Sequence, residues 1–300
     1  YASTDPDFIP EDVPVAMADI SDLKMTIVTN DPTKRYYYTL LFDDKYRVKI
    51  ATRNINIPGV QNFRDLGGYP SYSTKKQMRW GMIYRSAEID SLECSSRREL
   101  KNLGIKTLID LRASSEIGRQ SPLQKGFNVV HIPLATGDME GILKGIREEK
   151  IKCDTVYRMV ERMNRVLIDQ YTKEYRQIFD ILLDKNSYPV VIHCSSGKGR
   201  TGIVSALVLA ALGINEDIIM EDYRLSNDYF NIPSASKDAY QLPARSQEAI
   251  TTLFSAREDF LNAAKDEAER RYGDMDTYLR KGIGLSKNEI KRLRSILLSN

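Results

Sequence analysis

Three short apolar runs stand out in the middle of the chain. They are "TLIDL" (107–111), "NVVHIPL" (128–134) and "PVVIH" (189–193), and runs of this kind are typical of strands buried on both faces of a sheet. Amphipathic stretches that predict helices, "SSRRELKNLG" and "YTKEYRQIFDILLD", precede the first and the third run. This alternation predicts an α/β fold with a central, mostly parallel sheet flanked by helices.

The pattern after residue 213 is helical. "SQEAITTLFSAREDFLNAAKDEAERRYG" predicts a long amphipathic helix. "SKNEIKRLRSILL" opens with Ser286 and has Glu289 three residues later, which is a capping box at a helix start. We therefore expect a helical C-terminal part.

The first 54 residues differ from the rest. "LKMTIVTN", "RYYYTLLFD" and "KYRVKIAT" are rich in β-branched and aromatic residues and are separated by turn signals. They predict a small β-rich segment over residues 1–54, ahead of a main domain over residues 55–300. We expect the segment to serve packing and linkage. Binding of a carbohydrate or protein partner by the aromatic run Tyr36 to Tyr38 is the alternative.

The composition excludes several classes of protein. Charged residues make up 28% of the chain and the net charge is +3, without the block of Lys and Arg that a nucleic-acid partner favours. The longest apolar run, residues 202–214, is too short to span a bilayer. Three cysteines are too few for a disulfide framework. The two histidines, without HExxH or a paired CxxC, predict no metal and no cofactor.

The segment "PVVIHCSSGKGRTG" (189–202) carries the clearest chemistry. A buried strand runs into Cys194, a Gly/Ser loop follows, and Arg200 stands where a helix is expected to begin. A cysteine reacts as thiolate, and its pKa falls beside cations, a helix N-terminus or inward-pointing amides. Arg200 can grip two oxygens of a phosphate. The loop residues that could surround that phosphate are Ser195, Ser196, Gly197, Lys198 and Gly199.

A thiolate beneath a phosphate-binding loop indicates hydrolysis of phosphomonoesters through a cysteinyl-phosphate, without a metal. Thr201 could hydrogen-bond the sulfur and help it leave, and we expect His193 to fix the loop rather than act as a base. A Walker loop does not fit, because Ile192 and Gly199 occupy two of its required positions. A buried structural cysteine and a non-catalytic phosphate-binding module are the remaining alternatives.

These motifs resemble the cysteine-dependent tyrosine phosphatase superfamily, whose signature is HCxxGxxR[ST]. "NFRDLGGY", "IYRSAEIDSL", "LIDLR", "HCSSGKGRTG", "EDYRLSND" and "YGDMDTYLRKGIGLS" follow one another in the order of its bacterial branch, of which mycobacterial PtpB and cyanobacterial IphP are typical. The resemblance spans residues 55–298. It implies a tyrosine-phosphatase-like fold, with Cys194 as the nucleophile and Arg200 as the phosphate clamp.

The resemblance also implies the substrates. Phosphotyrosine in proteins is expected first, with phosphoserine or phosphothreonine in some members, and phosphoinositides or inositol phosphates are the alternative. A phosphate ion is expected to bind in the loop. A lysine at the position of Lys198 accompanies lipid-phosphate activity in that branch. Gly199 departs from the branch, which usually has an aspartate there, and makes the loop more positive.

The leaving oxygen needs a proton from a carboxylic acid above the loop. Asp138, in "HIPLATGD", follows the second apolar run on a Gly-bearing loop and is the first candidate. Asp110, at the end of "TLID", is the second, although pairing with Arg112 or Arg64 would give it a structural role.

The expected compartment is outside the cytoplasm. The chain starts at Tyr1 rather than Met, which, with the β-rich segment and the resemblance, predicts an exported bacterial protein that is periplasmic, lipid-anchored or secreted. A reactive thiol oxidises easily, so a cytoplasmic location is the alternative.

Overall fold

The computed structural model describes residues 1–29, 31, 34–90, 94–117 and 126–299. Its central sheet has the strand order β4-β7-β10-β8-β9. The strands are β4 (Arg64–Asp65), β7 (Ile83–Ser86), β8 (Thr107–Asp110), β9 (Asn128–His131) and β10 (Val190–His193). β7, β10, β8 and β9 are parallel, and only β4 is antiparallel to its neighbour. The predicted α/β class with a mostly parallel sheet is therefore confirmed.

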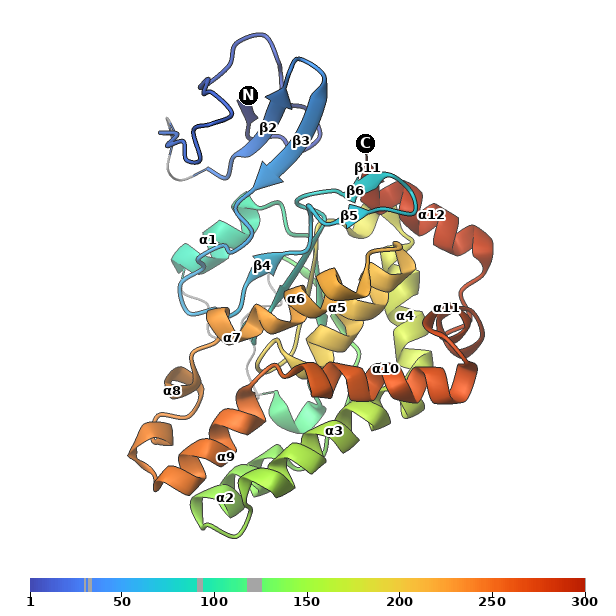
Figure 1. The fold of residues 1–300 in the computed structure, drawn as a ribbon. Helices are drawn as coiled ribbons and strands as arrows, with labels where there is room; N and C mark the ends of the chain where they lie inside the picture. Colours follow the sequence, from blue (N-terminus) through green and yellow to red (C-terminus); the bar gives the residue numbers. More distant parts are fainter. Residues whose placement is uncertain (30, 32–33, 91–93, 118–125, 300) are drawn as a thin grey trace.

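The helices cover both faces of this sheet (Figure 1). They are α1 (Cys94–Asn102), α2 (Met139–Arg147), α3 (Cys153–Gln170), α4 (Thr172–Leu182), α5 (Gly199–Ala211), α6 (Glu216–Arg224), α7 (Ser226–Tyr229), α8 (Ile232–Ala235), α9 (Ala244–Phe254), α10 (Glu258–Tyr272), α11 (Met275–Thr277) and α12 (Lys287–Leu297). Short 3-10 helices are η1 (Ser114–Glu116), η3 (Lys185–Ser187) and η4 (Ala239–Gln241), and η5 (Tyr278–Gly282) is a π-helical turn.

Side chains alternate between the two faces of the central strand β10. Val191 packs with Leu100 of α1 in one core cluster. Val190 and Ile192 belong to the larger cluster, which includes α4, α5, α10 and α12. Burial on both faces explains why the sequence reads as a continuous apolar run here. Because β7, β8 and β10 are parallel and in register, their carboxyl ends meet at one edge.

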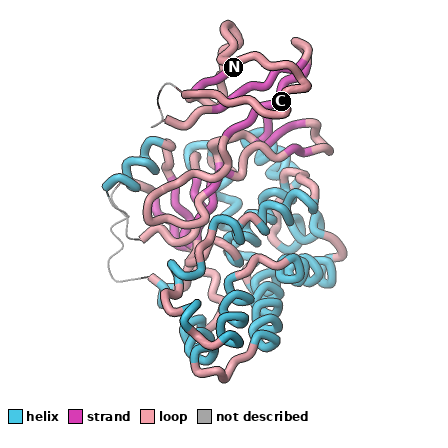
Figure 2. The backbone as a smooth tube through the Cα atoms, turned by 60° about the vertical axis from the view of Figure 1, so that its left-hand side comes forward, coloured by secondary structure: helices cyan, strands magenta, loops and turns pink. Residues whose placement is uncertain are grey.

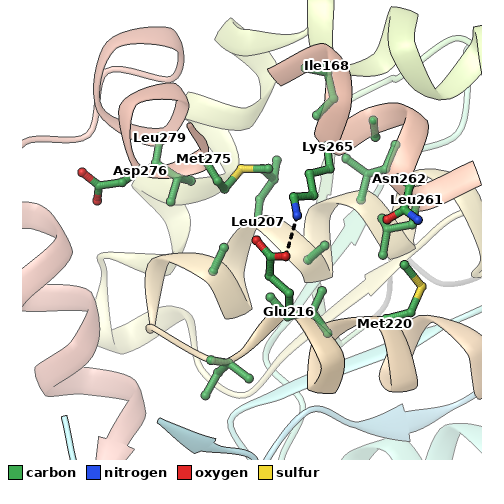
Figure 3. Close-up of a pocket in the computed structure, with 16 residues that line it drawn as sticks. Ile168, Leu207, Glu216, Met220, Leu261, Asn262, Lys265, Met275, Asp276 and Leu279 are labelled. Atoms are coloured by element: carbon green, nitrogen blue, oxygen red, sulfur yellow. Dashed lines mark hydrogen bonds and ion pairs between the residues drawn. The ribbon is translucent and has the colours of Figure 1, made fainter. Parts of the chain in front are cut away.

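Helix α5 runs through the larger core, and most of its residues are buried. A Cβ at Gly202 would lie 2.7 Å from the Tyr223 ring, so glycine allows α6 to pack closely. Beside α5, a cavity of about 250 Å³ lies against α6, α10 and α11, with the Glu216–Lys265 ion pair along it at 2.5 Å (Figure 3). No described helix, α5 included, has the length and apolar character needed to cross a membrane.

The β-rich segment is a separate three-stranded sheet of β1 (Ala2–Ser3), β2 (Tyr37–Phe42) and β3 (Tyr46–Ala51). It lies at the end of the molecule where both termini are found (Figure 2). Two of the three strands expected there are confirmed. The strand expected from "LKMTIVTN" is wrong, because residues 23–29 have no regular structure and Leu23 and Val28 are 99% and 88% exposed.

The C-terminal part is helical with two differences. The long helix expected over residues 246–273 is wrong, since α9 and α10 are separated at residues 255–257. Asn227 accounts for the break: its side chain bonds both the N–H and the carbonyl of Ala256, which therefore leave the helical ladder. The capping box is confirmed at α12. The chain then ends in β11 (Leu298–Ser299), which pairs with β6 (Lys76–Met78) beside β5 (Pro70–Ser71).

A buried charge cluster joins the sheet to α6. The carboxylate of Asp222 accepts from Arg64 at 3.2 Å and from Arg85 at 2.5 Å, and all three side chains are at most 1% exposed. Burial raises the pKa of Asp222, but the two guanidinium groups outweigh burial and hold that pKa at about 2. Two buried arginines thus share one carboxylate.

Replacing Asp222 with alanine should leave both buried arginines without their anion. We expect Asp222→Ala to lower the free energy of unfolding by about 3–5 kcal/mol, measured by urea denaturation at pH 7. The control is Glu258→Ala, which breaks a pair with Arg224 whose side chains are 55% and 58% exposed and should cost less than about 1 kcal/mol. Equal losses in the two variants would contradict the structural role given to Asp222.

Candidate active site

The loop predicted to bind phosphate lies at the carboxyl edge of the sheet, between the end of β10 and the start of α5. Cys194 is the first loop residue and is 2% exposed. Gly197 has φ +67°, and a Cβ there would lie 2.4 Å from the backbone of Ser86. Only glycine fits this position, because both the backbone angle and the contact exclude a side chain.

The outer side of the loop is held by two polar side chains. Asn62 donates from Nδ2 to the carbonyls of Ser196 and Gly197, at 3.0 and 3.1 Å. Arg85 donates to the Gly197 carbonyl at 2.8 Å. With these carbonyls bound on the outside, the N–H groups of Gly197 and Thr201 are free to face the Cys194 sulfur.

The surroundings of Cys194 favour the thiolate. Burial raises the pKa of this thiol, but the charge of Arg200 and hydrogen bonds from Thr201 and Gly197 outweigh it, so the pKa lies below its ordinary value. The start of α5 adds the positive end of a 13-residue helix. The site therefore holds the anionic form that a nucleophilic cysteine needs.

Arg200 is oriented by a carboxylate that the sequence analysis did not include. Glu116, in η1, accepts from both terminal nitrogens of Arg200 at 2.5 and 2.7 Å, and from the Ser195 hydroxyl at 2.6 Å. Burial raises the pKa of Glu116, but these hydrogen bonds lower it to about 2. The sequence offers one indication of this role: Glu116 follows closely after "LIDLR", whose strand ends at the same edge of the sheet as the loop.

His193 and Asp110 support the loop from behind. His193 is fully buried, and burial lowers its pKa to about 4, so the ring is neutral at pH 7. Its Nδ1 lies 3.9 Å from Asp110. Asp110 accepts from Arg112 at 2.7 Å, and this pair holds the pKa of Asp110 below its ordinary value despite burial. Asp110 thus has the structural pairing given above as its alternative, while Arg64 pairs with Asp222 instead.

The side chain of Lys198 points away from the solvent-exposed surface of the loop. Its side chain is buried, and Nζ donates to the Leu253 carbonyl in the last turn of α9 at 2.5 Å. Nζ also lies 6.0 Å from the centre of the Phe260 ring. Burial, together with the charge of Arg257, lowers the pKa of Lys198 to about 7. The lysine therefore ties the loop to α9, while its backbone remains part of the loop.

Two acidic side chains are candidates for the proton donor, and they differ in environment. Asp138 is exposed and caps α2, accepting from the Gly141 N–H at 2.9 Å. It stands four residues after Leu134, whose carbonyl accepts from Arg200 at 3.3 Å. Glu88, not singled out in the sequence, donates its backbone N–H to the Ser195 carbonyl at 3.1 Å. Partial burial and the charge of Asp90 raise the pKa of Glu88.

The described part of the chain contains no group of three or more His, Cys, Asp or Glu side chains that could hold a metal ion. Cys94 and Cys153 are free and lie outside the loop; Cys153 has its sulfur 3.2 Å from the Thr252 hydroxyl. The geometry of the loop, with one thiolate, one arginine and inward amides, suits a dianionic phosphate ester.

Comparison with known proteins agrees with this geometry. Residues 55–299 match the tyrosine phosphatase family, and the chain belongs to that family. It is therefore a phosphoric monoester hydrolase of the tyrosine-phosphatase type.

Two relatives and one solved structure illustrate the similarity. The triple specificity protein phosphatase PtpB of Mycobacterium tuberculosis is 30% identical over 285 residues, covering 81% of this chain and 98% of PtpB. A tyrosine-protein phosphatase of Nostoc commune is 25% identical over 221 residues, covering 70% of this chain and 72% of the relative. The crystal structure of TpbA from P. aeruginosa overlaps with a TM-score of 0.30 and 15% identity, over 59% of this chain and 89% of TpbA.

The buried neutral His193 makes stability depend on pH. In the unfolded chain its pKa is near 6.5, so between pH 6.5 and 4 the unfolded state binds a proton that the folded state does not. Stability is therefore lost as the pH falls through this window, by roughly 3 kcal/mol for this residue. In His193→Gln, the free energy of unfolding should therefore decrease less between pH 7 and pH 4.5 than in the wild type, as measured by urea denaturation at both pH values.

The matched control is the exposed His131, whose Nε2 lies 2.6 Å from the Arg112 carbonyl. His131→Gln should keep the pH dependence of the wild type. If His193→Gln loses as much stability between the two pH values as the wild type does, the buried neutral state of His193 is refuted.

Proposed function

We propose that this enzyme removes phosphate from phosphotyrosine in proteins, with Cys194 as the nucleophile. The observation that carries the proposal is the Cys194 sulfur lying beneath a glycine-dependent loop at the N-terminus of α5, with its pKa lowered by Arg200. A thiolate at this place can attack phosphorus in line, while Arg200 and the loop amides bind the equatorial oxygens.

The chemistry follows in two steps. In the first, an S–P bond forms, the P–O bond to tyrosine breaks, and its electron pair leaves on the phenolic oxygen, which takes a proton from an acid. In the second, water attacks phosphorus, the S–P bond breaks, and Cys194 returns to thiolate as inorganic phosphate forms. The Thr201 hydroxyl is buried and has no hydrogen-bond partner among the described residues, so it is available to donate to the departing thiolate in this second step.

Asp138 is the acid that we assign to the first step. The segment that carries it contacts Arg200 through the Leu134 carbonyl, and Gly137 precedes it with φ +95°, a backbone angle that glycine adopts without strain. Asp110 is unsuited, because its pairing with Arg112 keeps it ionised. Glu88 is the second candidate, since its raised pKa favours the protonated form that an acid catalyst needs.

Phosphoinositides and inositol phosphates are the second substrate class. The relative PtpB is named a triple specificity phosphatase, and Gly199 supports a more highly charged substrate. A Cβ at Gly199 would meet no atom within 4 Å, so open space and no carboxylate stand beside the loop there. Export from the cytoplasm remains a prediction from the sequence.

The first test compares substrates and a cysteine variant. Phosphate release is measured from a phosphotyrosine peptide, a phosphoserine peptide, a phosphoinositide in micelles and a soluble inositol phosphate, with and without chelator. We expect the phosphotyrosine peptide to be fastest, and Cys194→Ser to lower its turnover by more than about a thousandfold. The control Cys153→Ser should keep full activity. A wild type that binds phosphate but releases none from any substrate would favour a non-catalytic phosphate-binding module.

The second test concerns the acid. Asp138→Asn keeps the cap of α2, because asparagine caps as well as aspartate does, but removes the proton donor. We expect kcat for phosphotyrosine to fall by about 10²–10³, and to fall much less for an aryl phosphate whose phenol is more acidic and leaves without a proton. Glu88→Gln is run beside it. If only Glu88→Gln shows this dependence on the leaving group, the assignment moves to Glu88.

A further inference from the structure

The cavity beside α5 is mostly apolar. It holds about 250 Å³ between α5, α6, α10 and α11 (Figure 3), and all but four of the 16 residues that line it are apolar. Protein interiors seldom leave a space much larger than a water molecule unfilled. Here the small side chains of Ala206 and Ala210, which lie one turn apart on the same face of α5, line the space and leave it open.

The cavity opens to solvent beside its polar residues, which are Glu216, Asn262, Lys265 and Asp276. The side chains of Glu216 and Asp276 are 71% and 68% exposed, whereas Leu207, on the α5 side of the cavity, is only 2% exposed. A ligand could therefore place an apolar body inside the cavity and leave a polar group at the surface.

The opening carries more negative than positive charge. Lys265 Nζ lies 2.5 Å from Glu216 and 3.7 Å from Glu269, so two carboxylates flank one ammonium group. Asp276 adds another carboxylate, which Arg280 approaches at 3.5 Å. Three of these five groups are negative and two are positive, which leaves one negative charge unbalanced. A cationic ligand is therefore favoured over an anionic one at this opening.

The volume of the cavity limits the size of the ligand. An apolar cavity of about 150 Å³ can hold benzene, and pockets for drug-sized ligands begin at about 300 Å³. We propose that the cavity is a binding site for a small amphiphilic amine, whose apolar body packs against Ala206 and Ala210 of α5 and whose positive charge pairs with Glu216.

This site is separate from the catalytic loop, although both involve α5. Arg200 stands in the first turn of α5, whereas the part of α5 that lines the cavity starts at Ile203. None of the described residues that line the cavity belongs to the loop over residues 194–200. We therefore expect the amine and inorganic phosphate to bind at the same time. The proposal goes beyond the function proposed above and does not depend on which phosphate ester is hydrolysed.

The test uses octylamine, octanol and octanoate, which share one chain length and differ in charge. Each is titrated, below the concentration at which it forms micelles, into the full chain with isotope-labelled methionine methyl groups. Met220 and Met275 line the cavity, and Met17, which is 85% exposed in the β-rich segment, is the internal control. We expect saturable shifts of the Met220 and Met275 signals in nuclear magnetic resonance spectra. Octylamine should bind about tenfold more tightly than octanoate, with octanol between them.

Two variants and a matched control locate the ligand. Ala206→Leu fills part of the cavity with a larger side chain and should abolish the shifts. Glu216→Gln should weaken octylamine about threefold, as expected for an exposed ion pair, and change octanol binding by less than about twofold. Asp217→Asn removes the neighbouring carboxylate on α6, which does not line the cavity, and should change neither.

Three results would contradict the proposal. Octanoate that binds as tightly as octylamine would exclude a cationic ligand. Unchanged Met220 and Met275 signals with all three compounds would exclude the site itself. Displacement of octylamine by inorganic phosphate would place the amine at the catalytic loop instead. Failure of the proposed function is distinguishable, because an enzyme without turnover on any phosphate ester would leave these binding results as they are.

Discussion

The carboxylate of Asp222 is the interaction on which the site depends. It joins Arg64 and Arg85, which are 158 and 137 residues away in the sequence, and all three side chains are buried. Arg85 then donates to the Gly197 carbonyl, and Arg64 bonds the Asn62 side chain. Arg85 and Asn62, which hold the loop carbonyls, are thus both positioned by the buried ion cluster around Asp222. A charge cluster of this kind adds little net stability, but it fixes where the loop carbonyls point and hence where the amides point.

The charges around Cys194 stabilise its thiolate form, but no fully charged, unpaired cation is bonded to the sulfur among the described residues. Arg200 is the cation that lowers the pKa of Cys194, and it is paired with Glu116, whose own pKa is held at about 2. Lys198 is a second nitrogen beside the loop, but burial lowers its pKa to about 7, so it contributes less than a full charge near neutral pH. The thiolate and Glu116 together carry more negative charge than Arg200 balances, so the attraction for an incoming phosphate dianion must come in large part from the loop amides and the N-terminus of α5.

Much of the fold and the loop could be predicted from the sequence, for physical reasons that also explain the failures. The buried strands and the capping box depend on residues close in the chain, so local patterns reveal them. The glycines of the loop are visible in the same way, although Asn62 and Arg85 hold its final conformation from far along the sequence. The break between α9 and α10 depends on Asn227, which lies 29 residues before Ala256. Glu116 was missed because its role depends on a contact 84 residues away. The residue types at positions 23–29 favour a strand, but a strand forms only when a neighbouring strand hydrogen-bonds to it, and this local pattern does not reveal whether one is present.

Lys198 shows most clearly why a motif does not determine the role of each of its members. In the sequence it stands between Gly197 and Gly199, where a lysine would be expected to face the phosphate. In the structure its long apolar stem is buried and its amine meets a helix C-terminus, where the carbonyls are unpaired and a cation is favoured. The position of α9 decides this outcome, and α9 is placed by packing against α2 and α3. The role of Lys198 is therefore determined by a helix that the signature motif does not contain.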